Sequence, residues 1–248
     1  MKICVLIKQV PDKDSSLNIA DDHLTLVENN ITWVSNESDN YALEEALLLK
    51  EKHGGEVIAC TLGKDSAKQV LKDALAKGAD RGIFISDSSF ENLDILSLGK
   101  VISSTLEKEN FDLIMTGLQS DDQGNSQLGL ILAELLNMSH GTLVMGTEIM
   151  GDSTIKVKKE LEGGWFQWIS MDLPALLTIQ SGINQLRYAT LKGIMAAKKK
   201  EIKKVPLLDG LKESQVILGL AVPVKSKKTR MIKGPPDKAA EELVRCLK

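Results

Sequence analysis

Short apolar runs alternate with helix-forming segments through the first half of this sequence. The predicted strands lie at residues 1–10, 56–62, 81–85 and 112–116. The predicted helices lie at residues 36–53, 66–77, 94–109 and 128–136. Strands and helices that alternate in this way form βαβ units, in which the strands are parallel and the crossover connections are right-handed. The first half is therefore predicted to be a doubly wound α/β domain.

Local residue preferences mark where these elements begin and end. The run 1–10 is rich in β-branched and aliphatic residues, which is typical of a strand covered on both faces, and Pro11 is expected to end it. Residues 36–39 offer Asn, Ser and Asp side chains that favour a helix start, and Gly54 and Gly55 close the helix that follows. These signals favour a mostly parallel sheet with helices on both faces.

The pattern changes after Gly141. Strand candidates then follow one another without intervening helices, at residues 142–149, 154–161, 165–171 and 175–179. Turns rich in glycine separate them, so an antiparallel addition to the sheet is expected. Trp165 and Trp168 fall in one of these candidates, and we interpret them as packing residues.

Beyond Gln180 the chain is mostly irregular. A short helix is predicted around residues 191–197, a lysine-rich run follows it, and a terminal helix is predicted at 237–248. The end of the chain is rich in Pro and Lys and is too polar to form a core of its own. We therefore expect a folded α/β domain at 1–205 and an extended C-terminal tail at 206–248 that docks on another subunit.

The composition excludes several classes of protein. The 248 residues carry a formal net charge of −3, which argues against a broad nucleic-acid surface, because such a surface needs clustered positive charge. No apolar run approaches the roughly eighteen residues of a transmembrane helix, and the N-terminus lacks the pattern of a signal peptide. We expect a cytoplasmic protein with no nucleic-acid partner and no membrane span.

The cysteines and histidines form no recognisable site. Cys4, Cys60 and Cys246 are far apart and have no CxxC spacing, and the histidines are scattered without metal-ligand spacing. No nucleophile motif accompanies them. The sequence therefore predicts no disulfide framework, no metal site and no catalytic residue.

The most informative segment is GLQSDDQGNSQLG, residues 117–129. It joins the C-terminal end of a predicted strand to the start of a predicted helix, which is where open α/β sheets bind ligands. The unpaired N–H groups of a helix start can hold a phosphate, and Gly117 and Gly124 let the backbone come close to a ligand. Neutral hydrogen-bonding groups follow at residues 125–127. The segment is a candidate nucleotide loop.

Asp121 and Asp122 constrain how a nucleotide would lie on this loop. A carboxylate about 4 Å from a phosphate costs about 1 kcal/mol even in bulk water. We therefore expect both side chains to face ribose hydroxyls, an amide or solvent, with the phosphate nearer residues 123–128. On pattern alone, a solvated loop capped by Asp122 and Ser126 fits the sequence equally well. The GxGxxG and GxxxxGK[ST] motifs are absent, so phosphoryl transfer is disfavoured.

Several segments carry a pattern that is specific in combination. The loop 117–129 runs from Gly-x-Gln through Asp-rich residues into a helix. VKKELEGGWFQWISMDLPALLT, residues 157–178, contains a basic residue, an acidic-Gly-Gly turn, a Gln, and then a Pro with an apolar pair. The other segments are KICVLIKQVPD, YALEEALLLKE, KGADRGIFI and GINQLRYATLKGIMAAKKKEI. In this order they resemble the β subunits of electron transfer flavoproteins, and together they cover most of residues 1–205.

The resemblance implies a fold of the adenine nucleotide α-hydrolase-like type and an obligate heterodimer with an α subunit. In this family the α subunit holds the redox FAD, and the β chain holds AMP, or a second FAD in electron-bifurcating members. The chain would then be an electron carrier subunit and not an enzyme, with electrons reaching it from flavin dehydrogenases or other redox proteins. Residues 1–205 would bind the nucleotide, and the tail 206–248 would dock on the α subunit.

The resemblance also implies which residues contact the nucleotide. Carried over position by position, they lie at strand ends, at helix starts and in the loop, as nucleotide binding by an α/β sheet requires. They are Leu6, Asn36, Glu37, Ser38, Asp39, Leu62, Gly117, Leu118, Gln119, Ser120, Asp121, Asp122, Gln123, Gly124, Asn125, Ser126, Gln127 and Leu128.

Leu191 is implied as an anchor that inserts into a pocket of partner dehydrogenases. The alternative is a helix-start residue that packs inside this chain. A lysine cluster follows it, which forms a solvated face and would also attract acidic partners. Its members are Lys198, Lys199, Lys200, Lys203 and Lys204.

Two other functions stay open at this level. A stand-alone adenine nucleotide-binding module would need no redox partner, although the match over residues 157–202 argues against it. An electron-bifurcating subunit would hold a second FAD. The sequence does not separate AMP from FAD, because both contain an adenosine monophosphate portion.

Overall fold

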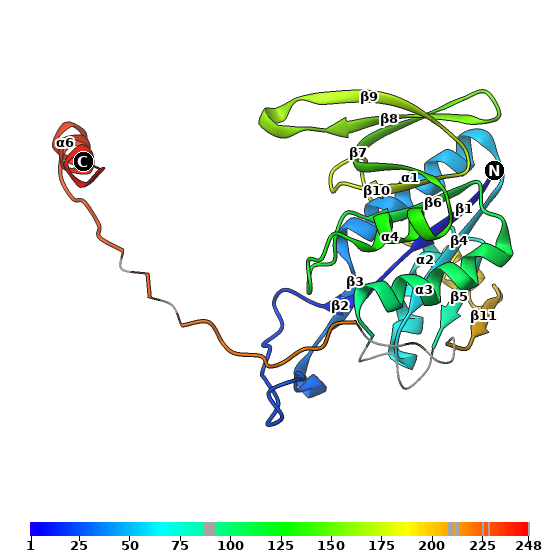
Figure 1. The fold of residues 1–248 in the computed structure, drawn as a ribbon, viewed down its shortest axis with the longest axis horizontal. Helices are drawn as coiled ribbons and strands as arrows, with labels where there is room; N and C mark the ends of the chain where they lie inside the picture. The colour runs from blue at the N-terminus through cyan, green and yellow to red at the C-terminus, as the bar shows by residue number, and fades with distance from the viewer. Residues whose placement is uncertain (87–92, 208–210, 212–213, 225, 228, 248) are drawn as a thin grey trace.

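The computed structural model describes all of the chain except residues 87–92, 208–210, 212–213, 225, 228 and 248. The described residues form a nine-stranded sheet with the strand order β11-β5-β4-β1-β6-β10-β7-β8-β9 (Figure 1). Its strands are β1 (Lys2–Leu6), β4 (Glu56–Leu62), β5 (Arg81–Ile85), β6 (Leu113–Gly117), β7 (Ser139–Met150), β8 (Thr154–Glu160), β9 (Phe166–Asp172), β10 (Ala175–Ile179) and β11 (Ile202–Val205). A small separate sheet pairs β2 (Gln9–Pro11) with β3 (Trp33–Ser35). The α-helices are α1 (Glu37–His53), α2 (Lys68–Lys77), α3 (Ile95–Leu106), α4 (Leu128–Leu135), α5 (Leu191–Ala197) and α6 (Pro236–Leu247).

Helices cover both faces of the sheet (Figure 1). On one face, α1 and α2 pack on strand residues such as Val5 and Met115. On the other face, α3 and α4 pack on Cys4 and Ile114. Because successive side chains of a strand point to opposite faces, the neighbours Cys4 and Val5 belong to different layers of the core. The predicted doubly wound, mostly parallel fold is confirmed.

The first strand is shorter than its apolar run. β1 ends at Leu6, and soon afterwards the backbone leaves the sheet, where the N–H of Lys8 donates to the Asp39 carboxylate at 2.8 Å. The chain then forms β2, in which Pro11 lies opposite Trp33. The prediction of one strand over residues 1–10, stopped by Pro11, was therefore wrong. A buried acceptor on α1 takes the hydrogen bond that a longer strand would have needed.

The antiparallel addition consists of β7, β8 and β9. β10 does not belong to it, because this strand lies between β6 and β7 and runs parallel to both. All of its residues, ALLTI, are buried, and a continuous apolar run is typical of a strand covered on both faces. The expectation that residues 175–179 continue the antiparallel addition was wrong. After the β8–β9 hairpin the chain returns to the centre of the sheet.

β11 was not predicted from the sequence. It pairs in parallel with β5 at the edge of the sheet. Ile202 packs against the core, while Lys203 and Lys204 are exposed. Lysines are common on edge strands, because they hinder pairing with another chain. The same lysines concealed the strand pattern.

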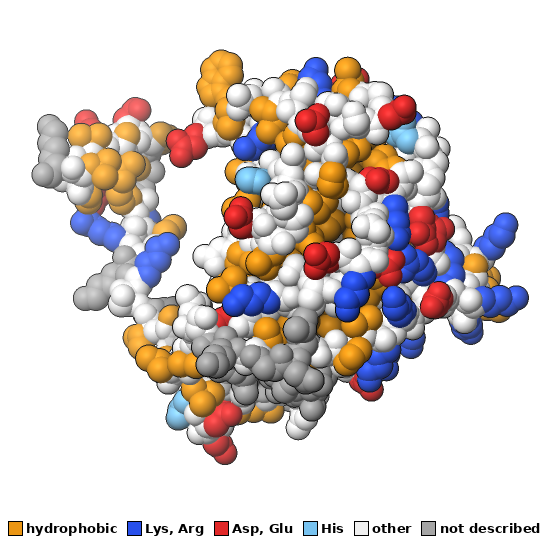
Figure 2. All heavy atoms as spheres, turned by 45° about the vertical axis from the view of Figure 1, so that its right-hand side comes forward, with side chains coloured by type: hydrophobic (Ala, Val, Ile, Leu, Met, Phe, Trp, Pro, Cys, Tyr) orange, Lys and Arg blue, Asp and Glu red, His pale blue; other side chains and the backbone are white. Residues whose placement is uncertain are grey.

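The β8–β9 hairpin exposes large aromatic side chains. Trp165 precedes β9 and is 75% exposed, and Phe166 and Trp168 are 45% and 46% exposed. The amino group of Lys158 lies 4.0 Å from the centre of the Phe166 ring. Hydrophobic side chains stand out at the top of Figure 2, the level at which this hairpin lies in Figure 1. The interpretation of Trp165 as a packing residue is therefore wrong within this chain, whereas Trp168 is about half-buried and its ring centre lies 5.1 Å from the amino group of Lys156.

The helix α6 lies at the end of an extended segment, away from the sheet (Figure 1). None of its described residues is buried, and its apolar side chains Leu243, Val244 and Leu247 are exposed. The predicted terminal helix is confirmed, and its apolar side chains have no cover within the described chain. Among the helices that the structure describes, none is long and apolar enough to cross a lipid bilayer.

Candidate nucleotide site

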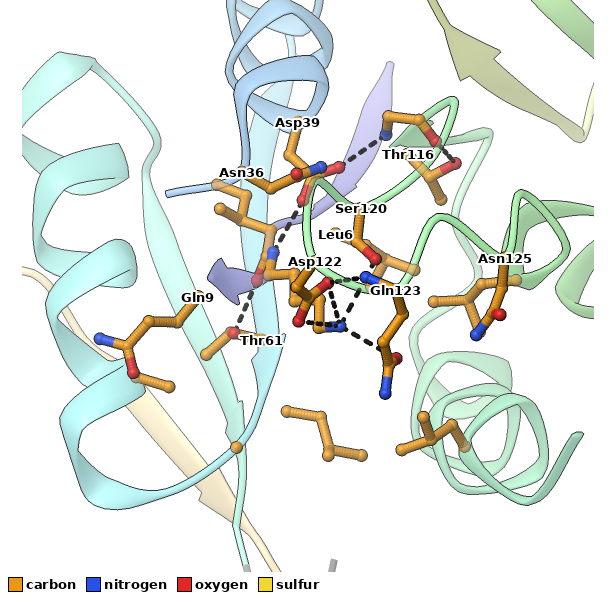
Figure 3. A pocket seen from close by; sticks show the side chains of 18 of the residues that line it. Leu6, Gln9, Asn36, Asp39, Thr61, Thr116, Ser120, Asp122, Gln123 and Asn125 are labelled. Carbon is orange, nitrogen blue, oxygen red and sulfur yellow. Dashed lines mark hydrogen bonds and ion pairs between the residues drawn. The ribbon is translucent and has the colours of Figure 1, made fainter. Parts of the chain in front are cut away.

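A cavity of about 350 Å³ opens where the C-terminal ends of β1, β4 and β6 face the starts of α1 and α4 (Figure 3). Its walls come mainly from residues 6–9, 60–67 and 116–129. These stretches are far apart in the sequence and meet because parallel strands end at the same edge of the sheet. This edge is where open α/β sheets bind ligands.

Asp39 joins three elements beneath the cavity. Its carboxylate accepts from the N–H of Lys8 at 2.8 Å and from the N–H of Gly117 at 2.9 Å (Figure 3). The side chain thus ties the start of α1 to the chain that follows β1 and to the end of β6. Burial raises the pKa of Asp39 from 3.8 to about 6, although the hydrogen bonds from Lys8, Asn36 and Gly117 oppose this shift. Asp39 is therefore mostly ionised at neutral pH, at a cost in folding free energy.

This cost predicts a pH dependence of stability. Because the pKa of Asp39 is higher in the folded chain, protonated Asp39 favours folding below pH 3.8, and this contribution is lost as the pH rises through about 6. The loss corresponds to at most about 3 kcal/mol. We therefore expect Asp39 to lower the unfolding free energy of the wild type as the pH rises from 4 to 7. This is roughly the range set by the ordinary and the raised pKa of Asp39.

Asp39→Asn does not titrate and should lack the decline. Urea unfolding of the wild type and of Asp39→Asn between pH 4 and 7 measures how steeply the unfolding free energy of each changes with pH. The difference between these two slopes does not depend on any overall loss of stability in the variant. Identical slopes would contradict the assignment to Asp39.

Asn36 and Ser38 hold the loop that follows β6. Asn36 donates from Nδ2 to the carbonyl oxygen of Gln119 at 2.9 Å and accepts at Oδ1 from the N–H of Asp121 at 2.9 Å. The hydroxyl of Ser38 donates to the same Gln119 oxygen at 2.8 Å. Asn36 and Ser38 are both buried. They therefore shape the loop through its backbone.

The loop aspartates face different groups. Asp121 accepts from the N–H of Glu37 at 3.2 Å, at the first turn of α1, where a negative charge is favourable. Asp122 forms an ion pair with Lys8, whose amino nitrogen lies 2.8 Å from the carboxylate. Partial burial opposes ionisation of Asp122, but the hydrogen bond and charge of Lys8 prevail and hold its pKa below the ordinary value. Both carboxylates are thus engaged by groups of this chain.

The start of α4 has no side-chain cap. Gln127 occupies the N-cap position without bonding to the first turn, and the Ser126 hydroxyl donates to the side-chain oxygen of Gln119 at 2.9 Å. Neither Asp122 nor Ser126 therefore caps α4, so the expected capping is wrong, and whether the loop binds a nucleotide stays a prediction. The first N–H groups of α4 have no side-chain acceptor at the N-cap, and the helix dipole favours an anion there.

An apolar wall lies in the same cavity. Leu6 and Leu62 come from the ends of β1 and β4, and Leu98 and Ile102 come from α3. Leu128 extends this wall to the start of α4. The cavity therefore offers an apolar surface for a flat ring and, beside it, a helix start for an anionic group.

Most of the predicted contact residues surround this cavity. Those that line it are Leu6, Asn36, Asp39, Leu62, Gly117, Leu118, Gln119, Ser120, Asp122, Gln123, Asn125, Ser126, Gln127 and Leu128. Glu37, Ser38, Asp121 and Gly124 lie outside its lining. The Ser38 hydroxyl supports the loop, and the Asp121 carboxylate accepts from the backbone N–H of Glu37 at the start of α1. Direct contact of any of these residues with a nucleotide stays a prediction.

Sequence reasoning missed a second group of lining residues. Lys8 and Gln9 follow β1, and Gly63, Lys64 and Ser66 follow β4. The signal for the second stretch was present, since it also joins the end of a predicted strand to the start of a helix. From this stretch the resemblance implied only Leu62, at the end of the strand.

Leu191 begins α5 and is 79% exposed. The hydroxyl oxygen of Thr190 caps this helix by accepting from the N–H of Gly193 at 3.0 Å. Tyr188 and Met195 nearby are also exposed. The alternative in which Leu191 packs inside this chain is therefore wrong.

The lysines after α5 do not all face solvent. Lys200 donates to the carbonyl oxygens of Leu75 and Ala79, at 3.0 Å and 2.6 Å, and so ties the chain just after α5 to the C-terminal end of α2 and the turn that follows it. The exposed members are Lys198, Lys199, Lys203 and Lys204. Figure 2 shows basic side chains, with acidic ones among them, along one side of the molecule. The basic surface is smaller than the sequence indicated.

Comparison with known proteins agrees with this geometry. A family model described as "Electron transfer flavoprotein domain" matches residues 23–209. The chain is 34% identical to the electron transfer flavoprotein subunit beta of Methylophilus methylotrophus over 259 residues, covering 100% of this chain and 98% of that protein. The corresponding Bacillus subtilis subunit is 34% identical over 255 residues, with the same coverage. The human subunit is 34% identical over 206 residues, covering 82% of this chain and 80% of that protein.

The resemblance inferred from the sequence segments is thus confirmed along the chain. The family model spans most of the residues, and the bacterial relatives match from end to end. The mostly parallel sheet with its antiparallel hairpin agrees with the adenine nucleotide α-hydrolase-like fold of this family. The chain belongs to the β-subunit family of the electron transfer flavoproteins, a family of electron carriers.

Proposed function

We propose that this chain is the β subunit of a heterodimeric electron transfer flavoprotein and that its own cavity holds AMP as a structural nucleotide. The observation that supports this most is the cavity itself, which joins an apolar wall to the uncapped start of α4. Its volume of about 350 Å³ is near the lower end of ligand pockets, about 300–1,000 Å³, which favours AMP over a second FAD. In this proposal the chain is an electron carrier subunit and not an enzyme.

The cavity indicates how AMP would lie. The adenine would rest against Leu6 and Leu62, and the phosphate would lie near residues 123–128, beside the first N–H groups of α4, which begins at Leu128. Asp122 is turned toward Lys8, so its charge is compensated and does not oppose the phosphate. The redox FAD would be held mainly by the α subunit.

Two exposed apolar surfaces support an obligate α subunit. The aromatic side chains of the β8–β9 hairpin and the apolar side chains of α6 are exposed in this chain. Exposed apolar groups gathered in this way are typical of surfaces that another chain covers. We propose that residues 1–205 form the nucleotide-binding domain and that the tail 206–248 docks on the α subunit.

Partner docking is proposed at α5. Leu191 would insert into a pocket of a flavin dehydrogenase or another redox protein, from which the carrier accepts electrons and later passes them on. The exposed lysines after α5 would speed association with acidic partners, an effect that salt weakens. We propose the cytoplasm as the location.

Co-expression with the α chain of the same organism tests the proposed function. We expect a yellow heterodimer that contains equimolar FAD and AMP, and a lone β chain that is poorly stable and free of flavin. Acid extraction followed by chromatography measures both nucleotides. A second equivalent of FAD in place of AMP would establish the bifurcating alternative. A stable, colourless lone chain that binds ATP would establish the stand-alone module.

Acidic residues at the start of α4 are expected to expel the nucleotide. In Ser126→Asp/Gln127→Glu, a carboxylate about 4 Å from the phosphate would cost about 4 kcal/mol, or roughly a thousandfold in affinity. Ser126→Asn with native Gln127 is the matched control, since it has the same shape without the charge, and Asn also tolerates the positive φ of residue 126. The AMP content of the purified heterodimers measures the effect. Stoichiometric AMP in the acidic variant would mean that the phosphate lies elsewhere.

A further inference from the structure

The segment between β10 and α5, residues 180–190, leads to Leu191 and contains neither helix nor strand. Its backbone is therefore not held by a regular ladder of hydrogen bonds. Hydrogen bonds between its side chains and α1 hold it instead. Asn184 donates from Nδ2 to the carbonyl oxygen of Tyr41 at 3.2 Å and to the carboxylate of Glu45 at 3.0 Å. These contacts fix the first part of the segment.

Arg187 makes the most extensive contact with α1. Its Nε and Nη2 each donate to the Glu44 carboxylate at 2.9 Å, and its backbone N–H donates to the same carboxylate at 3.2 Å. Its Nη1 donates to Glu51 at 2.6 Å. The side chain of Glu44 is only 6% exposed, whereas that of Arg187 is 28% exposed. The hydrogen bonds to Glu44 and Glu51 raise the pKa of Arg187 above its ordinary value.

A second set of contacts holds α5 itself. Gly193 packs so closely on the carbonyl oxygen of Ala76 in α2 that a Cβ at residue 193 would overlap it. Lys200 adds the hydrogen bonds to α2 described above. Leu191 therefore lies between two residues that are held in place: Arg187, which is bonded to Glu44 of α1, and Gly193, which packs on α2.

We propose that Arg187 and Glu44 are positioning residues that hold the exposed Leu191 in the orientation that partner docking requires. This inference rests on the proposed docking role of Leu191. Glu44 is buried, so it acts through Arg187 and not by touching a partner. Arg187 in turn fixes the backbone shortly before the anchor.

The energetics of the pair support a positioning role. A mostly buried ion pair contributes little net stability compared with apolar side chains of similar volume, because both charges must leave water. A guanidinium that donates to both oxygens of one carboxylate nevertheless fixes a single geometry. In a segment without regular secondary structure, this geometry selects one arrangement of the chain that leads to Leu191.

Arg187→Lys tests the proposal, because lysine keeps the charge but cannot form the two-pronged contact. If the segment then adopts the docking orientation about a tenth of the time, the apparent dissociation constant rises about tenfold. The probe is a flavin dehydrogenase from the same cells, chosen because it reduces the FAD of the wild-type heterodimer. We expect about tenfold weaker binding of this dehydrogenase, an unchanged kcat at saturation, and unchanged FAD and AMP content.

Arg81→Lys is the matched control. Arg81 also bridges two carboxylates, those of Glu56 at 2.9 Å and Glu109 at 2.8 Å, and its side chain is 19% exposed. It lies on β5 and not on the segment before α5. We expect Arg81→Lys to lower the unfolding free energy about as much as Arg187→Lys does. It should still bind the dehydrogenase as the wild type does.

The double variant Arg187→Lys/Leu191→Ala separates positioning from a general structural effect. If Arg187 acts through Leu191, the double variant binds no more weakly than Leu191→Ala alone. Wild-type affinity in Arg187→Lys, or effects that multiply in the double variant, would overturn the inference. If Leu191→Ala itself binds as the wild type does, the proposed docking role fails, and weaker binding by Arg187→Lys would then mean that Arg187 contacts the partner directly, which also overturns the inference.

Discussion

Gly117→Ala is expected to empty the nucleotide cavity and to lower the unfolding free energy by about 3 to 5 kcal/mol, the combined cost of overpacking and of a lost hydrogen bond to a buried carboxylate. A Cβ at residue 117 would overlap the Ser38 hydroxyl and the Asp39 carboxylate and would lie 2.8 Å from the backbone nitrogen of Asp39. The effect comes from lack of space and not from an unusual backbone angle. Displacing Asp39 would release its contacts with Lys8 and the end of β6 together.

The matched control for this variant is Gly219→Ala. A Cβ at residue 219 would meet no atom nearer than the carbonyl oxygen of His23, at 3.9 Å. AMP content of the heterodimer and chemical unfolding measure the two expected effects. Full AMP content together with wild-type stability in Gly117→Ala would show that the close approach of β6 to α1 is not needed for the site.

Leu191→Ala is expected to weaken dehydrogenase binding roughly thirtyfold, since an anchor buried in a partner pocket contributes about 2 kcal/mol and each 1.4 kcal/mol is tenfold. The side chain is 79% exposed, so its removal should leave the melting temperature, FAD content and AMP content nearly unchanged. A core leucine would instead lose about 2 to 5 kcal/mol of folding stability on truncation to alanine. The exposure of Leu191 predicts the first outcome.

Leu17→Ala is the control for loss of an exposed leucine. Leu17 is 51% exposed and lies between β2 and β3, far along the chain from α5. Binding titrations and dehydrogenase-dependent reduction of FAD, measured beside thermal unfolding, separate docking from folding. A large drop in melting temperature with unchanged docking affinity would contradict the anchor role.

The site was predictable in part because nucleotide binding by this fold depends on local features. The loop 117–129 combines a strand end, glycines and a helix start, and all of these are visible within one short stretch of sequence. The polar partners within the site were not visible in this way. Lys8 reaches Asp122 across 114 positions of sequence, and Asp39 reaches Gly117 across 78.

By itself the sequence determined the layers of the fold. The spacing of apolar side chains in segments such as 56–62 and 66–77 depends only on near neighbours, so it showed the alternation of strands and helices. It also located the terminal helix, because a helix pattern does not depend on what the helix contacts.

The tertiary structure alone decided which distant segments meet. It placed β10 between β6 and β7, ended β1 early because Asp39 takes the N–H of Lys8, and made an edge strand from the lysine-rich residues of β11. It also brought Arg187 onto Glu44 and left Leu191 exposed. Strand order, ion pairs and exposure depend on contacts between residues far apart in the chain. The local spacing of side chains does not predict these contacts.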